Sequence, residues 1–136
     1  MGFDAGGLMR MERPMLVVAL CLEDAGGRLL LARRPAGRHH GGLWEFPGGK
    51  VEKGETPRMG LAREIVEELA IRIDPVALVP LTFAEDDRLV LLLFGARSAE
   101  GEVIALEDQE WGWFTREAAA ALPLAPLDRQ MLQVLA

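Results

Sequence analysis

The chain has 136 residues, half of them hydrophobic, and a formal net charge of −6 at pH 7. Its length and apolar content predict one globular domain, residues 14–136, behind a flexible tail at residues 1–13. The acidic balance argues against electrostatic binding of polymeric nucleic acid. Cys21 is the only cysteine, which permits no intramolecular disulfide and favours a reducing, cytoplasmic compartment. The apolar run at 15–22 is too short to span a membrane, so no membrane partner is expected.

Apolar runs and turn residues predict the following elements in chain order. Strands are predicted at 15–22, 28–34, 44–46, 76–83, 89–94 and 111–114, and helices at 57–69, 115–121 and 127–135. Asp24-Ala25-Gly26-Gly27 predicts a turn that joins the first two strands as a hairpin. Strands mixed with two or three helices indicate an α/β layered fold.

Three glutamates of the predicted helix at 57–69 fall on one face. Glu64, Glu67 and Glu68 are related as i, i+3 and i+4, and the apolar residues of the helix occupy the opposite face. Crowded carboxylates repel one another and raise each other's pKa, a penalty that a bound divalent cation removes. Hard cations such as Mg²⁺ prefer oxygen ligands. Glutamates on an amphipathic helix are more often solvated surface, so the helix alone does not decide between a surface and a metal site.

The loop before this helix supplies the context that favours a metal site. Gly48-Gly49 follows a short apolar run, and Gly54-Glu55 closes the loop. Thr56-Pro57 is typical of an N-cap followed by proline at the first helical position. Loop, cap and acidic helix therefore form one unit.

This unit resembles a known family motif. Gly49, Glu55, Arg63-Glu64-Ile65, Glu67-Glu68 and Ile71 resemble the Nudix box, G-x5-E-x7-R-E-U-x-E-E-x-G-U, where U is a bulky aliphatic residue. Ala70 stands where the family has glycine, and alanine in a left-handed conformation costs roughly 1 kcal/mol, so we expect local strain or a slightly longer helix. The preceding LWEFPGGK is similar to the MutT-type branch, and a weaker similarity extends from about residue 14 to 135. The resemblance implies an α/β/α sandwich with a central mixed β-sheet.

The resemblance also implies a set of metal ligands. Glu64, Glu67, Glu68 and the backbone carbonyl of Gly49 are the expected ligands of Mg²⁺, with Mn²⁺ as a substitute. Together these ligands would hold one or more cations that polarise phosphoryl oxygens and activate water. A histidine metal site is not expected, because neither paired cysteines nor a further histidine accompanies the two histidines.

Three further residues have roles implied by the family. Glu107 precedes Trp113 by six positions and resembles a glutamate that serves as an extra metal ligand or general base; the alternative is a solvated loop acid. Arg63 is expected to orient a glutamate by a charge-assisted hydrogen bond rather than to touch substrate, or else to be an exposed helix arginine. Glu55 is expected to brace the loop.

The substrate contacts are the least specific part of the resemblance. The implied contacts are Arg34, Arg88 and His39 for the phosphates and nucleotide, and Glu45, Phe46 and Phe83 for the base. The alternatives are an exposed turn arginine for Arg88, a solvated loop histidine for His39, and core positions for the two phenylalanines. Arg34 matches the phosphate-binding arginine better than Arg33, although the register can slip by one. Pro126 stands where MutT-type enzymes read the base with Asn or Asp, and Asp128 can substitute if the loop is longer by two residues.

These features predict a Mg²⁺-dependent pyrophosphohydrolase that converts a nucleoside triphosphate to a nucleoside monophosphate and pyrophosphate. Oxidised dGTP is the preferred substrate on resemblance, followed by CTP or dCTP. Another diphosphate-linked compound, such as a nucleotide sugar or dinucleoside polyphosphate, would require the same box. A non-catalytic nucleotide sensor is disfavoured because the box carboxylates are all present. The family implies a monomer or homodimer with a small-molecule nucleotide as its partner.

Overall fold

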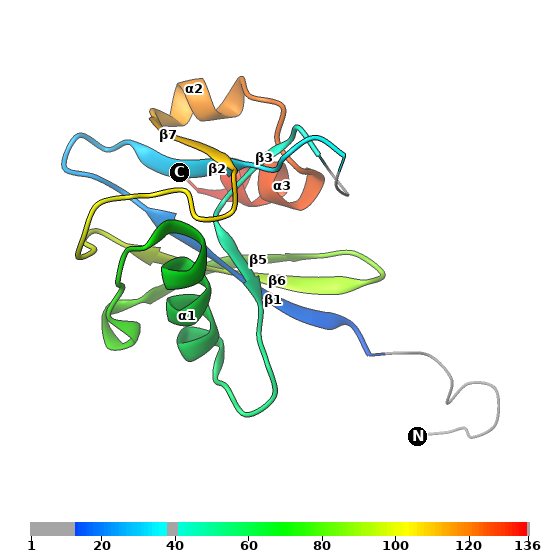
Figure 1. The fold of residues 1–136 in the computed structure, drawn as a ribbon. Coiled ribbons are helices and arrows are strands. Elements are labelled where there is room, and N and C mark those ends of the chain that lie inside the picture. Colours follow the sequence, from blue (N-terminus) through cyan, green and yellow to red (C-terminus); the bar gives the residue numbers. More distant parts are fainter. Residues whose placement is uncertain (1–12, 38–40, 136) are drawn as a thin grey trace.

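The computed structural model describes residues 13–37 and 41–135 (Figure 1). Its elements are β1 (Met15–Leu22), β2 (Leu29–Arg33), β3 (Trp44–Glu45), β4 (Gly48–Lys50), α1 (Pro57–Leu69), η2 (Pro75–Ala77), β5 (Val79–Glu85), β6 (Leu89–Ala96), β7 (Glu110–Phe114), α2 (Arg116–Ala120) and α3 (Pro126–Val134). Apart from residue 13, the predicted tail lies outside the described residues.

The strands form two sheets. The larger has the order β4-β1-β6-β5, in which β1 and β6 are parallel and the other pairs antiparallel. The smaller is antiparallel, with the order β3-β2-β7. Helix α1 covers one face of the larger sheet, and α3 lies on the other side with the smaller sheet (Figure 1). The expected α/β fold with a central mixed sheet is confirmed.

Alternate residues of β1 enter two separate cores, because successive strand side chains point to opposite faces. Val18 and Leu20 pack with Ile65 of α1 in one core. Ala19 and Cys21 pack with α3 in the other. A strand that is apolar on both faces has to be central in its sheet, and β1 is paired on both edges.

The prediction that the first two strands, β1 and β2, form a hairpin is wrong. Strands β1 and β2 belong to different sheets, and an isolated bridge between Glu23 and Leu29 joins their ends. The turn itself forms, since the Asp24 carboxylate accepts hydrogen bonds from the backbone N–H groups of Gly26 and Arg28. The chain then passes to the second sheet, because both edges of β1 are already occupied by β4 and β6.

Helix α1 has the bounds that its sequence signals predict. Thr56 Oγ1 accepts a hydrogen bond from the N–H of Met59 at 3.2 Å, and Pro57 begins the helix. The helix ends at Leu69 because Ala70 takes the left-handed conformation, with φ 62°, and donates its N–H to the carbonyl of Val66. The expected strain is therefore located at Ala70, downstream of the carboxylates.

Candidate active site

Two glycines bring the backbone of β4 against its neighbours. A Cβ on Gly48 would lie 1.9 Å from the carbonyl oxygen of Val18, and one on Gly49 would lie 2.3 Å from the carboxyl carbon of Glu64. A side chain at Gly48 would collide with backbone atoms, and one at Gly49 would require the Glu64 carboxylate to move. The Glu64 carboxylate of α1 is therefore held directly against the Gly49 backbone, which brings together two of the predicted metal ligands.

Arg63 connects the loop to the acidic face of α1. Its guanidinium donates to both carboxylate oxygens of Glu55, at 2.6 and 3.0 Å, and to the carbonyl of Lys50 at 3.0 Å. Its Nη1 lies 3.2 Å from oxygens of both Glu64 and Glu67. The bond to Glu55 is the main reason that the pKa of Arg63 is raised and that of Glu55 lowered. The contact predicted between Arg63 and a glutamate is present.

The carboxylates of Glu64 and Glu68 on α1 lie in surroundings that disfavour their ionised forms. Burial first, and then the charges of Glu64 and Glu107, raise the pKa of Glu68 to about 9. Burial is also the main cause that raises the pKa of Glu64, while Arg63 opposes the shift. A divalent cation beside these groups would favour their ionised forms. Crowded oxygen donors next to an open glycine backbone fit such a cation.

The predicted ligands are neighbours but are not collected around one point. Among residues 13–37 and 41–135, no three His, Cys, Asp or Glu side chains are close enough together to hold an ion as they stand. The Glu67 side chain is half exposed and paired with Arg63. Glu107 lies exposed on the loop between β6 and β7. A cation held by all of the predicted side-chain ligands would therefore require some of them to move closer together.

A polar cleft adjoins the acidic face. Its lining residues are Ala32, Arg33, Arg34, Pro35, Glu45, Gly48, Glu68, Glu107 and Gln109. Both candidate arginines reach it. Arg33 is bound to the carbonyl of Gly42 and to Glu110 at 3.2 Å, whereas Arg34 Nε donates to Glu45 at 2.9 Å. Arg34 also lines the neighbouring cavity.

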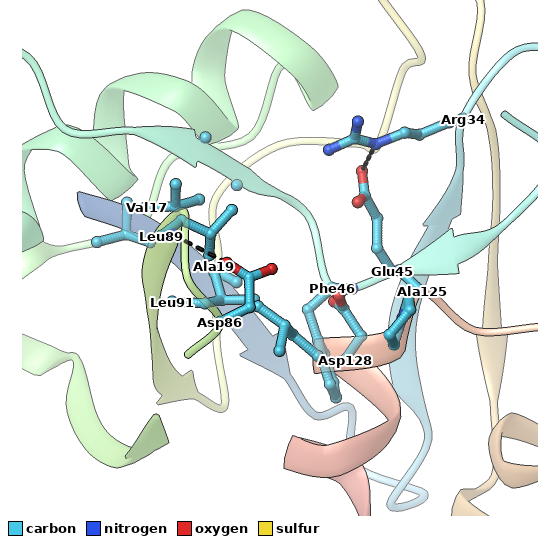
Figure 2. A pocket seen from close by; sticks show the side chains of 15 residues that line it. Val17, Ala19, Arg34, Glu45, Phe46, Asp86, Leu89, Leu91, Ala125 and Asp128 are labelled. Atoms are coloured by element: carbon cyan, nitrogen blue, oxygen red, sulfur yellow. Dashed lines mark hydrogen bonds and ion pairs between the residues drawn. The ribbon is translucent and has the colours of Figure 1, made fainter. Parts of the chain in front are cut away.

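A more apolar cavity opens beside the cleft and shares Arg34, Glu45 and Gly48 with it. Its walls include Val17, Ala19, Phe46, Leu89 and Leu91, and its carboxylates are Glu45, Asp86 and Asp128 (Figure 2). The Arg34–Glu45 ion pair and Asp128 line the same cavity (Figure 2), and the charge of Glu45 contributes to the raised pKa of Asp128. The two cavities together offer a charged end and an apolar end.

Asp128 also lines this cavity, and the sequence offers it only as a substitute for the base-reading Asn or Asp of the family. It lies in the first turn of α3, is 5% exposed, and accepts a hydrogen bond from the N–H of Phe46 at 2.9 Å. Burial, followed by the charge of Glu45, raises its pKa to about 7. Pro126 begins the helix, so the acid falls two residues later than in the family pattern.

The structure does not bring every predicted contact to these cavities. Phe83 is 61% exposed on the edge strand β5 and lines neither cavity. Arg88 is exposed in the turn before β6 and lines neither cavity. His39 lies outside the described residues. Phe46, in contrast, is buried and lines the apolar cavity.

Comparison with known proteins agrees with this fold and site. Residues 13–135 match the family model described as NUDIX domain, so the chain belongs to the Nudix family. It is 36% identical over 121 residues to a CTP pyrophosphohydrolase of Escherichia coli, covering 88% of this chain and 90% of that one. It is also 39% identical over 85 residues to an 8-oxo-dGTP diphosphatase of Proteus vulgaris, covering 61% of this chain and 75% of that one.

Two solved structures resemble it over nearly their whole length. The ORF135 protein of E. coli superimposes with a TM-score of 0.79 at 35% identity, covering 90% of this chain and 88% of that one. A MutT NUDIX hydrolase from Burkholderia pseudomallei gives 0.81 at 28% identity, covering 92% and 100%. The chain is therefore a MutT-type Nudix hydrolase, from a family that requires a divalent metal and acts on small nucleotides. None of its described helices is long and apolar enough to cross a membrane.

Proposed function

We propose that this protein is a Mg²⁺-dependent pyrophosphohydrolase that cleaves a nucleoside triphosphate into a nucleoside monophosphate and pyrophosphate. The continuity of the two cavities carries the proposal. Arg34, Glu45 and Gly48 line both, so a ligand can extend from the acidic helix face into the apolar cavity. A nucleoside triphosphate has this distribution of charge, with an anionic chain at one end and a flat base at the other.

In this proposal Glu64, Glu67, Glu68 and the Gly49 carbonyl hold the cation, with Glu107 as a further ligand or as the base that accepts the proton of the attacking water. A divalent cation there supplies positive charge at the phosphoryl oxygens and acidifies water. Magnesium is favoured because the donors are all oxygen atoms. Arg34 neutralises charge on the phosphate chain, and Arg63 keeps Glu64 and Glu67 in place.

The apolar cavity is proposed to hold the base, with Asp128 and Glu45 reading its edge. Carboxyl groups select bases that present N–H donors. Because the pKa of Asp128 is about 7, both of its protonation states are populated near neutral pH. The neutral acid can donate to cytosine N3 while accepting from its amino group. The ionised form can instead accept from the two adjacent N–H groups of a guanine edge.

CTP or dCTP is our first candidate substrate, and an oxidised guanine nucleotide such as 8-oxo-dGTP is the second. The CTP pyrophosphohydrolase of E. coli supports the first, since the similarity covers most of both chains. The P. vulgaris diphosphatase supports the second over a shorter stretch. A cytoplasmic location would give access to either nucleotide pool.

Product analysis tests the proposal. The enzyme would be incubated with Mg²⁺ and separately with CTP, dCTP, dGTP, 8-oxo-dGTP, an ADP-sugar and a dinucleoside polyphosphate, and products resolved by ion-exchange chromatography. A monophosphate and pyrophosphate are expected from one of the triphosphates, with Glu68→Gln inactive and the exposed Glu102→Gln unaffected. Preferential cleavage of the ADP-sugar, or release of orthophosphate from a triphosphate, would reject it. Tight nucleotide binding without turnover would indicate a sensor.

A further inference from the structure

The loop that carries Glu107 is fastened to the C-terminal end of α1. Arg72 and Glu100 exchange two backbone hydrogen bonds of 2.9 Å. The N–H of Ile104 then donates to the carbonyl of Leu69 at 3.0 Å. The last carbonyls of a helix have no partner within the helix, so these bonds both satisfy the helix end and fix the loop beside it.

Glu68 and Glu107 are joined more directly by one side chain. Gln109 Nε2 donates to the backbone carbonyl of Glu68 at 3.1 Å, and Gln109 Oε1 accepts from the backbone N–H of Glu107 at 3.0 Å. The Glu68 carbonyl also accepts from the N–H of Leu106 at 2.9 Å. The Gln109 amide therefore connects the main chains of two predicted metal ligands, and all three residues line the polar cleft.

The turn between Glu107 and Gln109 contains a residue in an unfavourable backbone conformation. Asp108 has φ 58°, in the left-handed region that disfavours residues with a side chain. Glutamine supplies one donor and one acceptor at the same time, and both are used here. A glutamate of the same size could not donate to the Glu68 carbonyl, and a leucine could make neither bond.

We propose that Gln109 is a positioning residue of this hydrolase. By holding the Glu107 main chain at a fixed place beside Glu68, it limits the rotamers from which the Glu107 carboxylate can join the metal shell. This inference rests on the proposed function, because it requires Glu107 to act at the metal. It adds a residue outside the Nudix box whose contribution passes through another side chain.

Metal binding without substrate provides the first test. Mn²⁺ affinity would be measured by electron paramagnetic resonance of the free ion for wild type, Gln109→Leu, the neutral and similarly sized Gln109→Met, and the exposed control Gln133→Leu. Loss of an outer partner of a metal ligand typically weakens affinity 10- to 100-fold. We expect about tenfold weaker binding for both Gln109 variants and no change for Gln133→Leu, at unchanged circular dichroism. Wild-type affinity in a folded Gln109→Leu or Gln109→Met protein would overturn the proposal.

A double-mutant cycle then separates positioning from a general structural effect. Gln109→Leu should lower kcat about tenfold in the wild-type background, with a small change in the nucleotide KM, yet add little once Glu107→Gln is present. Equal fold reductions in both backgrounds would show that Gln109 does not act through Glu107. If the wild type hydrolyses no nucleotide, the proposed function fails, whereas the Mn²⁺ measurements still decide the role of Gln109 in metal binding.

Discussion

Replacing Asp128 with asparagine should make stability less dependent on pH. The folded protein raises the pKa of this carboxyl from 3.8 to about 7, chiefly through burial. The folded state therefore retains a proton that the unfolded state has released, and this stabilisation is complete below the unfolded pKa and lost as pH rises through about 7. One pKa unit corresponds to about 1.4 kcal/mol, so wild type should lose about 3 kcal/mol between pH 5 and pH 8 through this group.

The asparagine side chain of the Asp128→Asn variant cannot ionise, yet its oxygen can still accept the hydrogen bond from Phe46. Urea unfolding followed by tryptophan fluorescence at pH 5, 6, 7 and 8 would measure the free energy of unfolding of both proteins. Asp128→Asn should gain on wild type steadily with pH, by about 3 kcal/mol over this range. The exposed Asp87→Asn serves as the matched control and should track wild type. A constant difference between Asp128→Asn and wild type at all four pH values would refute the reasoning.

Three further predictions concern α1. Ala70→Gly should raise the free energy of unfolding by about 1 kcal/mol, since glycine adopts a positive φ without strain; an unchanged or lower urea midpoint would contradict this. Glu67→Gln should lower kcat by orders of magnitude while leaving the melting temperature unchanged, and a near-normal kcat would remove Glu67 from the metal shell. Arg63→Lys loses the two-pronged contact with Glu55 and should weaken Mn²⁺ binding about tenfold by calorimetry, whereas unaltered affinity would show that Arg63 does not organise the ligands.

Local signals made α1 predictable from sequence alone. Its N-cap Thr56 and the proline after it act within one turn of the chain, and the structure gives the helix the predicted bounds. The left-handed Ala70 is one of the two outcomes expected at the glycine position of the Nudix box, where the sequence predicts either local strain or a slightly longer helix. Strand pairing depends on partners that are distant in sequence, and the hairpin between the first two strands was consequently misassigned.

Other features required the three-dimensional structure. Strand β4 consists largely of glycine, which has low strand propensity, and is formed by the close approach of Val18 and Glu64 to its backbone. The register shift between Pro80 and Thr82 and the exposure of Phe83 have no sequence signal that we recognised. Asp128 could be named as a candidate from its position, but only the fold shows its contact with Phe46 and its burial.

The Arg34–Glu45 ion pair stands where the two cavities meet, and this has a consequence for redesign of the enzyme. In the proposed function Glu45 reads the base and Arg34 binds the phosphate chain, so a substitution of Glu45 that alters base preference would also remove its hydrogen bond with Arg34 and change phosphate binding. A change of base selectivity made through Glu45 would therefore also change the rate of hydrolysis. Asp128 does not escape this coupling, because its carboxylate accepts a hydrogen bond from Phe46, the residue after Glu45, and its pKa responds to the charges of both Glu45 and Arg34.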